Sequence, residues 1–191
     1  GNTLMSWLDG RNTKTEAGYG EMTLRAGIFS ARGETLSEWE LDARVCDCCQ
    51  TSAAMSTAGP IIVYRDRSAE EIRDIYVTRY VNGNWTPPVA IHDDQWEIAG
   101  CPVNGPSVAA QGNFVAVGWF TAKDDSPKVQ LALSTDSGEH FSAPIRVSGP
   151  DTIGRIDTAV LANGQVAVSW LDMSAETAQL TVSRFSAGGS L

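Results

Sequence analysis

The sequence has few cationic residues, and this scarcity excludes several classes of partner. Its 191 residues include 14 lysines and arginines against 23 aspartates and glutamates, which gives a net charge of −9. Because nucleic acids and anionic lipids are themselves negative, we expect neither as a partner. No apolar run approaches the roughly 18 residues of a membrane-spanning helix, so no membrane insertion is expected.

Histidine, cysteine and helical periodicity are also scarce. The chain has two histidines, and its four cysteines are too few for a small fold built on disulfides. Apolar residues nowhere keep the spacing of a long amphipathic helix. Glycine is abundant, with 18 residues, and many of them stand in short turns between β-rich segments. These features predict an all-β chain that forms a single region over residues 1–191.

One turn, Ser134–Phe141, has the pattern S-x-D-x-G-x-x-F between two strand-like runs. We expect Asp136 to accept hydrogen bonds from backbone N–H groups of the turn, and Gly138 to adopt a positive φ. Phe141 is expected to fold back over the hairpin. Ser134, Asp136, Gly138 and Phe141 are therefore predicted to have a structural role.

Weaker copies of this unit recur along the chain, and one aromatic residue marks the register of each copy. The four residues are Trp7, Tyr64, Trp119 and Trp170, spaced 57, 55 and 51 residues apart. Short strands and glycine-containing turns flank each of them. About four strands in roughly 50 residues is typical of a β-propeller blade. A β-sandwich also has many short strands and is the alternative.

The repeat predicts about three and a half to four four-stranded blades. Their approximate limits are residues 1–42, 50–91, 106–148 and 156–191. The first lacks its innermost strand, and the last lacks its outermost strand. We therefore expect a piece of a larger propeller, or a homo-oligomer in which copies close the ring, because unpaired strand edges promote association.

Blade topology places long polar loops on the face opposite the Ser134–Phe141 turn, and such loops are where binding residues concentrate. The candidate ligand-binding residues there are Asp47, Arg65, Asp66, Arg67, Trp96, Arg155 and Asp157. The run Arg65-Asp66-Arg67 also fits a solvated surface ion pair. Trp96 is suited either to stacking on a sugar or to filling the gap between two blades. Asp93-Asp94 and Asp124-Asp125 are candidates for calcium binding or for solvated loop charge.

The cysteines fall in the same loops. Cys46 of the run Cys46-Asp47-Cys48-Cys49 lies 18 residues before Tyr64, and Cys101 lies 18 residues before Trp119. Equivalent positions of adjacent blades are close in space, so the four sulfurs are expected to converge. Three states are open. The first is a disulfide from Cys101 to the run, to which a short and strained second bond inside the run could be added. The second is a soft-metal site for zinc or copper, and the third is a set of reduced thiols.

The turn motif, the Cys46–Cys49 run and Gly100-Cys101-Pro102 together resemble bacterial sialidase-like proteins with BNR (Asp-box) repeats. This resemblance covers the chain at the level of blade pattern. It implies an all-β propeller of sialidase type and a secreted or periplasmic location. The family's aromatic-Arg-Ile-Pro motif is absent, and Gly154-Arg155-Ile156-Asp157 is the nearest string.

Three functions fit these observations. The first is a binding module that recognises a glycan or another extracellular ligand at the loop face. The second is an exo-sialidase-type glycoside hydrolase of which this chain holds only some blades. The third is a propeller that binds a metal through its cysteines.

Overall fold

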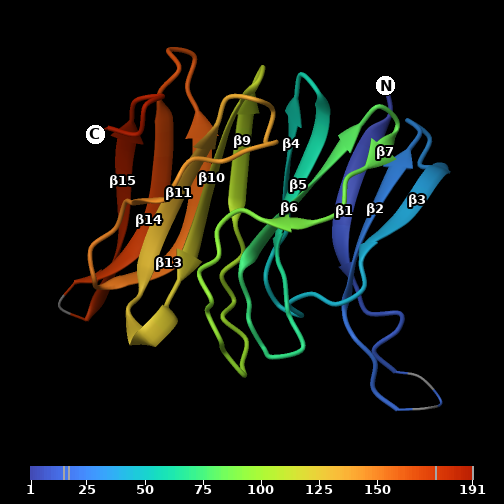
Figure 1. The fold of residues 1–191 in the computed structure, drawn as a ribbon, viewed down its shortest axis with the longest axis horizontal. Helices are drawn as coiled ribbons and strands as arrows, with labels where there is room; N and C mark the ends of the chain where they lie inside the picture. The colour runs from blue at the N-terminus through green and yellow to red at the C-terminus, as the bar shows by residue number, and fades with distance from the viewer. Residues whose placement is uncertain (15, 17, 175, 191) are drawn as a thin grey trace.

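A computed structural model describes residues 1–14, 16, 18–174 and 176–190. These residues form antiparallel strands and a three-residue 3₁₀ helix, Lys123–Asp125. The strands make four sheets that stand side by side, with the two termini at opposite ends of the row (Figure 1). The predicted all-β class is confirmed. The described residues include no helix with the length and apolar character needed to cross a membrane.

Each sheet is built from strands that follow one another in the chain. The first contains β1 (Thr3–Asp9), β2 (Thr23–Phe29) and β3 (Thr35–Asp42). The second contains β4 (Ser52–Ser56), β5 (Gly59–Arg65), β6 (Ile75–Val81) and β7 (Asn84–Trp85), and β8 (Val89–Ala90) also pairs with β6. The third contains β9 (Ser107–Gln111), β10 (Phe114–Thr121), β11 (Lys128–Ser134) and β12 (Ile145–Arg146). The fourth contains β13 (Thr152–Val160), β14 (Val166–Ser174) and β15 (Thr177–Phe185).

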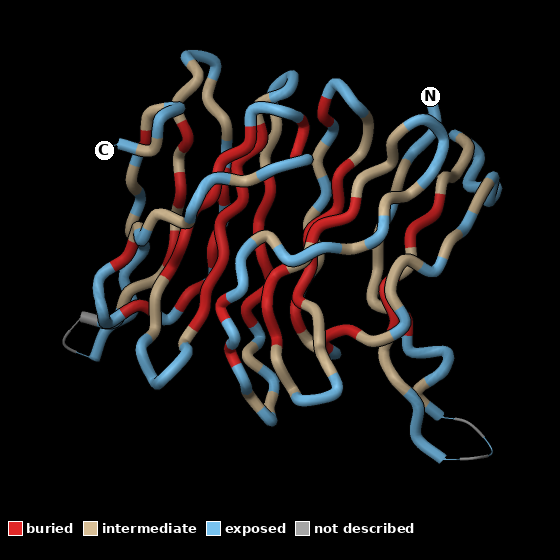
Figure 2. Tube along the Cα trace, viewed as in Figure 1, coloured by how far each residue is buried: buried red, intermediate tan, exposed pale blue. Residues whose placement is uncertain are grey.

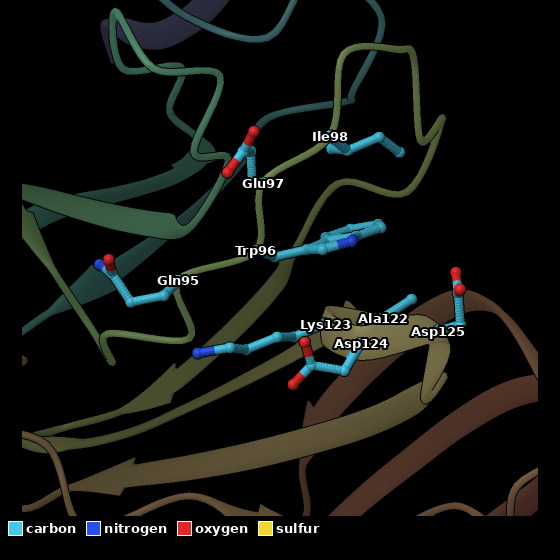
Figure 3. Close-up of a pocket in the computed structure, with 8 residues that line it drawn as sticks. All are labelled: Gln95, Trp96, Glu97, Ile98, Ala122, Lys123, Asp124 and Asp125. Carbon is cyan, nitrogen blue, oxygen red and sulfur yellow. The ribbon is translucent and has the colours of Figure 1, made fainter.

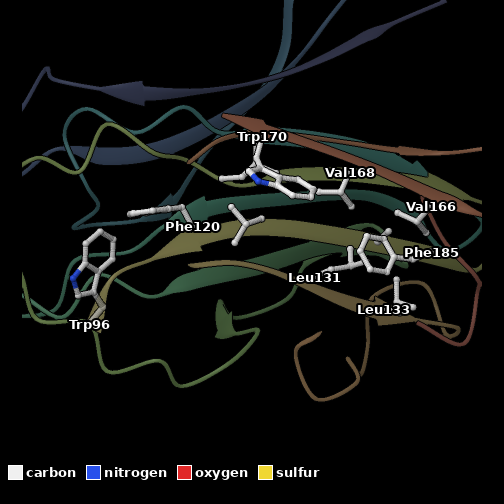
Figure 4. Packing of buried hydrophobic residues seen from close by; sticks show 11 residues of the cluster. Trp96, Phe120, Leu131, Leu133, Val166, Val168, Trp170 and Phe185 are labelled. Atoms are coloured by element: carbon white, nitrogen blue, oxygen red, sulfur yellow. The ribbon is translucent and has the colours of Figure 1, made fainter. Parts of the chain in front are cut away.

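The core lies between neighbouring sheets, where central strands are covered on both sides (Figure 2). Tyr64, Trp119 and Trp170 are buried as the repeat predicts, whereas Trp7 of the first sheet is only partly buried. In the cluster between the third and fourth sheets, Leu131 packs among side chains that include Val168 (Figure 4). Burial from both sides explains why β5 and β10 read as nearly continuous apolar runs instead of alternating.

The Ser134–Phe141 turn has the hydrogen bonds that its sequence predicts. An oxygen of Asp136 accepts the backbone N–H of His140 at 3.0 Å, and Ser134 Oγ accepts that of Gly138 at 2.9 Å. Gly138 has a φ of +78°. Phe141 packs against the core between the second and third sheets. The Ser137 N–H donates to the carbonyl of Asn113 in the β9–β10 turn, so both turns lie at one end of the sheet.

The structure differs from the sequence-based strands at the start of the fourth sheet. The prediction begins that strand near Asp157, whereas β13 begins at Thr152. Its pairing with β14 is interrupted on both sides of Gly154, which has a φ of +86°. A bulge therefore lets the strand extend into a segment whose sequence favours a loop.

Candidate functional site

The longer connections gather at the end of the molecule opposite the short hairpin turns, at the bottom of Figure 1. They include the segments before β4 and β9, and the loops that follow β5 and β10. This is the end where sequence analysis expects a ligand. Two cavities open here, one beside the cysteines and one beside Trp96.

The four cysteines converge as predicted. Cys48 and Cys101 form a disulfide, with Cα atoms 6.2 Å apart, that joins the loop before β4 to the loop before β9. The Sγ atoms of Cys46 and Cys49 are 2.9 Å apart, and Cys46 Sγ lies 3.9 Å from Cys48 Sγ. The second bond that was possible inside the run is not formed: Cys46 and Cys49 are free, buried thiols at a hydrogen-bonding separation.

Cys46 is the sulfur best suited to exist as a thiolate. Arg73 Nη1 donates a hydrogen bond to Cys46 Sγ at 3.4 Å. The hydrogen bond shared with Cys49, together with the Arg73 guanidinium, outweighs burial and lowers the pKa of Cys46 to about 5. The same shared bond, together with burial, raises the pKa of Cys49. The pair therefore holds one negative charge near neutral pH.

Arg65 is a buried residue, so its interpretation as part of a solvated surface ion pair is wrong. Its exposed fraction is 1% because it ends the buried strand β5. Its Nε and Nη2 atoms donate to the Asn104 carbonyl at 3.0 and 2.8 Å, and Nη2 also donates to the Phe120 carbonyl at 2.7 Å. The guanidinium lies 5.0 Å from the centre of the Trp96 ring. Arg65 thus connects the end of β5 to the loop before β9 and to β10.

Arg67 and Asp47 border the cavity beside the cysteines. This cavity of about 440 Å³ is lined by Asp47, Arg67, Glu71, Arg73, Ala99, Gly100 and Cys101. Glu71 accepts hydrogen bonds from Arg67 and Arg73, both at 2.7 Å, and these two partners lower the pKa of Glu71 to about 2. Arg67 also lies 3.6 Å from Asp47. Sequence analysis did not select Glu71 and Arg73 as candidate site residues.

Asp66 is a partly buried acid whose pKa is raised to about 7. Burial is the largest cause, and the neighbouring carboxyl of Asp42 adds to it. Asp42 also accepts a hydrogen bond from the Tyr64 hydroxyl. Two carboxyl groups in a weakly solvated place favour retention of a proton.

Arg155 and Asp157 lie on β13 and contact the segment around the start of β9. Arg155 Nη1 donates to the Val103 carbonyl at 2.9 Å, and its backbone N–H donates to Asn104 Oδ1 at 2.8 Å. Asp157 accepts the Ser107 hydroxyl at 2.9 Å. Asn104, which sequence analysis did not select, therefore connects Arg155 to Arg65.

A second cavity, of about 540 Å³, lies between the loop before β9 and the loop after β10 (Figure 3). It is lined by Gln95, Trp96, Glu97, Ile98, Ala122, Lys123, Asp124 and Asp125. Trp96 is 6% exposed, and its ring packs edge-on against Phe120 with ring centres 5.6 Å apart. These contacts fit the interpretation in which Trp96 fills the gap between two blades. The same ring also forms part of the cavity wall.

The two acidic pairs have different surroundings. Both oxygens of Asp94 are occupied, because they accept hydrogen bonds from Trp119 Nε1 and Gln130 Nε2, each at 2.7 Å. Asp94 therefore serves the core and does not fit the proposed calcium role. Asp124 and Asp125 are exposed on the 3₁₀ helix and line the larger cavity.

Comparisons with known proteins identify the fold. No family model and no curated protein matches the sequence. An α-L-arabinofuranosidase from Podospora anserina is similar in structure, with a TM-score of 0.51, 10% identity, and coverage of 96% of this chain and 59% of that one. An ulvan lyase has a TM-score of 0.52 and 12% identity, with coverages of 95% and 48%. A fructan 1-exohydrolase from Cichorium intybus has a TM-score of 0.53 and 11% identity, with coverages of 97% and 40%.

These three proteins are carbohydrate-active enzymes with propeller-like folds, and this chain spans between 40% and 59% of their length. At such low identity the similarity concerns the fold alone. The predicted β-propeller architecture is confirmed, with its four sheets in an open row. The sialidase type and the BNR (Asp-box) assignment stay predictions.

Proposed function

We propose that this chain binds a glycan in the cavity formed by residues 95–98 and 122–125. The observation that carries the proposal is the composition of that cavity. An indole ring and an aliphatic side chain form part of its wall, and Gln95, Lys123 and three carboxylates surround them. Small-molecule sites combine an apolar surface with a few hydrogen-bonding groups, and a volume of about 540 Å³ lies within their usual range.

The position of the cavity supports the same proposal. The 3₁₀ helix presents Asp124 and Asp125 from the loop after β10, while Trp96 is fixed by Phe120 and by the Arg65 guanidinium. Rigid supports hold the apolar wall, whereas Glu97, Lys123, Asp124 and Asp125 are exposed at the rim, where they can reach hydroxyl groups. Such a division suits a ligand that offers both apolar ring faces and polar edges.

The structurally similar proteins add support from their own ligands. The arabinofuranosidase was solved with cellotriose, and the fructan exohydrolase with 1-kestose. Because this chain shares only their fold and part of their length, these saccharides serve here as probes. Sialyllactose is added because the sequence resembles sialidase-like proteins.

A glycoside hydrolase is the second candidate, and the carboxylates of the cavity favour it over other enzymes. Glu97, Asp124 and Asp125 all line the cavity, and most glycosidases act through a pair of carboxyl groups. The sialidase-type mechanism has less support, since it needs arginines that grip a substrate carboxylate. Arg65 is buried against backbone carbonyls, and Arg67 is paired with Glu71.

The disulfide supports a location outside the cytosol, because such bonds persist in oxidising compartments. We therefore infer a secreted or periplasmic protein. The open row of sheets supports closure of the ring by further blades or by other copies of the chain. Sedimentation analysis of the isolated chain tests closure by other copies, which predicts a mass that is a multiple of the 20.4 kDa of one chain.

Calorimetric titration with cellotriose, 1-kestose, ulvan oligosaccharide and sialyllactose tests glycan binding. The Glu97→Gln/Asp125→Asn double variant should weaken the binding of the best probe, because both side chains are exposed and line the cavity. Glu139→Gln is the matched control, since Glu139 is exposed in the Ser134–Phe141 turn. Equal affinities for all three proteins would refute the assignment of the cavity. Release of reducing sugar from a probe would select hydrolysis over binding alone.

A further inference from the structure

Four sulfurs from two loops meet in one place, beside the cavity that Cys101 lines. The Sγ atoms of Cys46, Cys48 and Cys49 all lie within 4.8 Å of one another, and Cys101 is bonded to Cys48. Metal–sulfur bonds of about 2.3 Å in a tetrahedral site place sulfurs about 3.8 Å apart. The Cys46–Cys48 separation of 3.9 Å already has this value, and the 2.9 Å between Cys46 and Cys49 can widen by side-chain rotation.

Two buried guanidinium groups surround these sulfurs. Arg65 and Arg73 have exposed fractions of 1% and 5%. Arg65 donates hydrogen bonds to the neutral carbonyls of Asn104 and Phe120, and Arg73 Nη1 donates one to Cys46 Sγ at 3.4 Å. A buried cation requires a nearby anion. Arg73 already pairs with Glu71 at 2.7 Å, so Arg65 is the guanidinium whose charge additional thiolates would balance.

We propose that reduction of the Cys48–Cys101 disulfide creates a site in which Cys46, Cys48, Cys49 and Cys101 bind one thiophilic d¹⁰ metal ion, Zn²⁺ or Cu⁺. Soft thiolate ligands select these ions over Mg²⁺ and Ca²⁺. The proposal concerns a different place from the glycan cavity and does not depend on it. With Cys48 and Cys101 joined, only two free sulfurs remain, so the disulfide acts as the off state of the metal site.

The chemical balance requires a reductant, and an external dithiol is the class that fits. The dithiol gives up two electrons and two protons and becomes a disulfide, while the bond between Cys48 and Cys101 breaks and each sulfur gains a proton. The incoming metal then displaces thiol protons into solvent. Four thiolates around Zn²⁺ have a net charge of −2, which the buried charge of Arg65 and the hydrogen bond from Arg73 to Cys46 would partly offset.

The cavity of about 440 Å³ supplies the route to the sulfurs. Cys101 is exposed and lines it, together with Arg73 and Gly100. A reductant can therefore reach the outer sulfur of the disulfide from solvent. Cys46 and Cys49 lie deeper and are buried, so metal entering from the cavity would meet the exposed sulfur first.

Metal titration of the reduced and oxidised protein tests the proposal directly. The full chain is reduced and desalted under anaerobic conditions, then titrated with Co²⁺ as a spectroscopic substitute for Zn²⁺. Zn²⁺ and Cu⁺ affinities are measured by competition with chromophoric chelators. We expect one ion per reduced chain and an intense thiolate–cobalt absorption band. The oxidised chain should bind the metal more weakly than the reduced chain. The loss of affinity should exceed the roughly 10–100-fold that removal of a single outer-shell partner costs.

Single variants identify the ligands. Cys46→Ser and Cys101→Ser should each abolish the tetrahedral thiolate band, with folding checked by circular dichroism. Arg73→Gln should weaken the metal affinity by about 10–100-fold, because Arg73 contacts Cys46 Sγ. Arg79→Gln is the matched control, since Arg79 is an arginine of β6 that pairs with Glu139 and should leave the affinity unchanged.

Two results would overturn the proposal. One is equal metal binding by the reduced and oxidised wild-type protein, a comparison that involves no substitution and no risk of misfolding. The other is an unchanged thiolate band in Cys46→Ser. Neither result affects the saccharide titrations, which are performed on the oxidised protein.

Discussion

Gly138 is one of the points at which the Ser134–Phe141 turn of the third sheet contacts the second sheet. Its φ is +78°, and a Cβ placed there would lie 2.5 Å from Ile61 Cδ1. Gly83, in the turn between β6 and β7, has a φ of +83° with nothing within 4 Å of a Cβ. Comparing alanine substitutions at Gly138 and Gly83 therefore separates the cost of the backbone conformation from the cost of packing.

The expected magnitudes follow from these two environments. Alanine in the left-handed region costs about 1–2 kcal/mol at either glycine. Gly138→Ala adds an overpacked contact with the buried Ile61, which costs a further 1–3 kcal/mol or so. Gly138→Ala should therefore lower the free energy of unfolding by about 2 kcal/mol more than Gly83→Ala. In a chain of this size that difference corresponds to about 4–8 °C in Tm.

Urea and thermal unfolding, followed by tryptophan fluorescence, measure the two losses. Because Ile61→Val removes the Cδ1 atom, the double variant Gly138→Ala/Ile61→Val should recover part of the packing cost. Equal destabilisation by Gly138→Ala and Gly83→Ala, without recovery in the double variant, would refute the contact between the turn and the second sheet.

Two further substitutions test the electrostatics of the core. The folded pKa of Asp66, about 7, lies above its ordinary value, so the folded state binds a proton more tightly than the unfolded state. The free energy of unfolding should therefore fall between about pH 4 and pH 7, and Asp66→Asn should remove this fall in urea titrations. At pH 8 the Asp66→Asn substitution should raise the free energy of unfolding by about 2 kcal/mol. This is half of the value that the whole pKa shift would give, because the side chain is partly exposed to solvent. Asp94→Ala leaves Trp119 Nε1 and the Gln130 amide without their partner and should cost about 2–4 kcal/mol. Asp93→Ala, in the same loop, is the control, and equal losses would contradict the role of Asp94.

The sheets could be predicted from the sequence because their determinants are local. The spacing of Trp7, Tyr64, Trp119 and Trp170 fixes the position of one strand in each sheet, and the glycine-containing turns limit its neighbours. The pattern S-x-D-x-G is similarly local, so the hydrogen bonds of Asp136 follow from residues within the turn itself. The convergence of the cysteines follows from the same register.

The loop contacts could not be predicted, because they join residues distant in the sequence. Arg65 is separated by 39 residues from Asn104 and by 55 from Phe120, and only the packed sheets bring their carbonyls to it. Its position at the end of β5 is compatible with either exposure or burial. Glu71 and Arg73 stand in a charged segment that resembles a solvated loop, although Arg73 reaches Cys46.

Amide chemical-shift mapping tests the central claim, that glycans bind at the loop face, most directly. The isotope-labelled chain is titrated with the saccharide of highest affinity among the four probes. We expect shifts to concentrate at residues 95–98 and 122–125, including the indole N–H of Trp96, while the amides of residues 134–141 at the opposite end stay unchanged. Shifts confined to the Ser134–Phe141 turn, or no shifts with any probe, would contradict the proposed function.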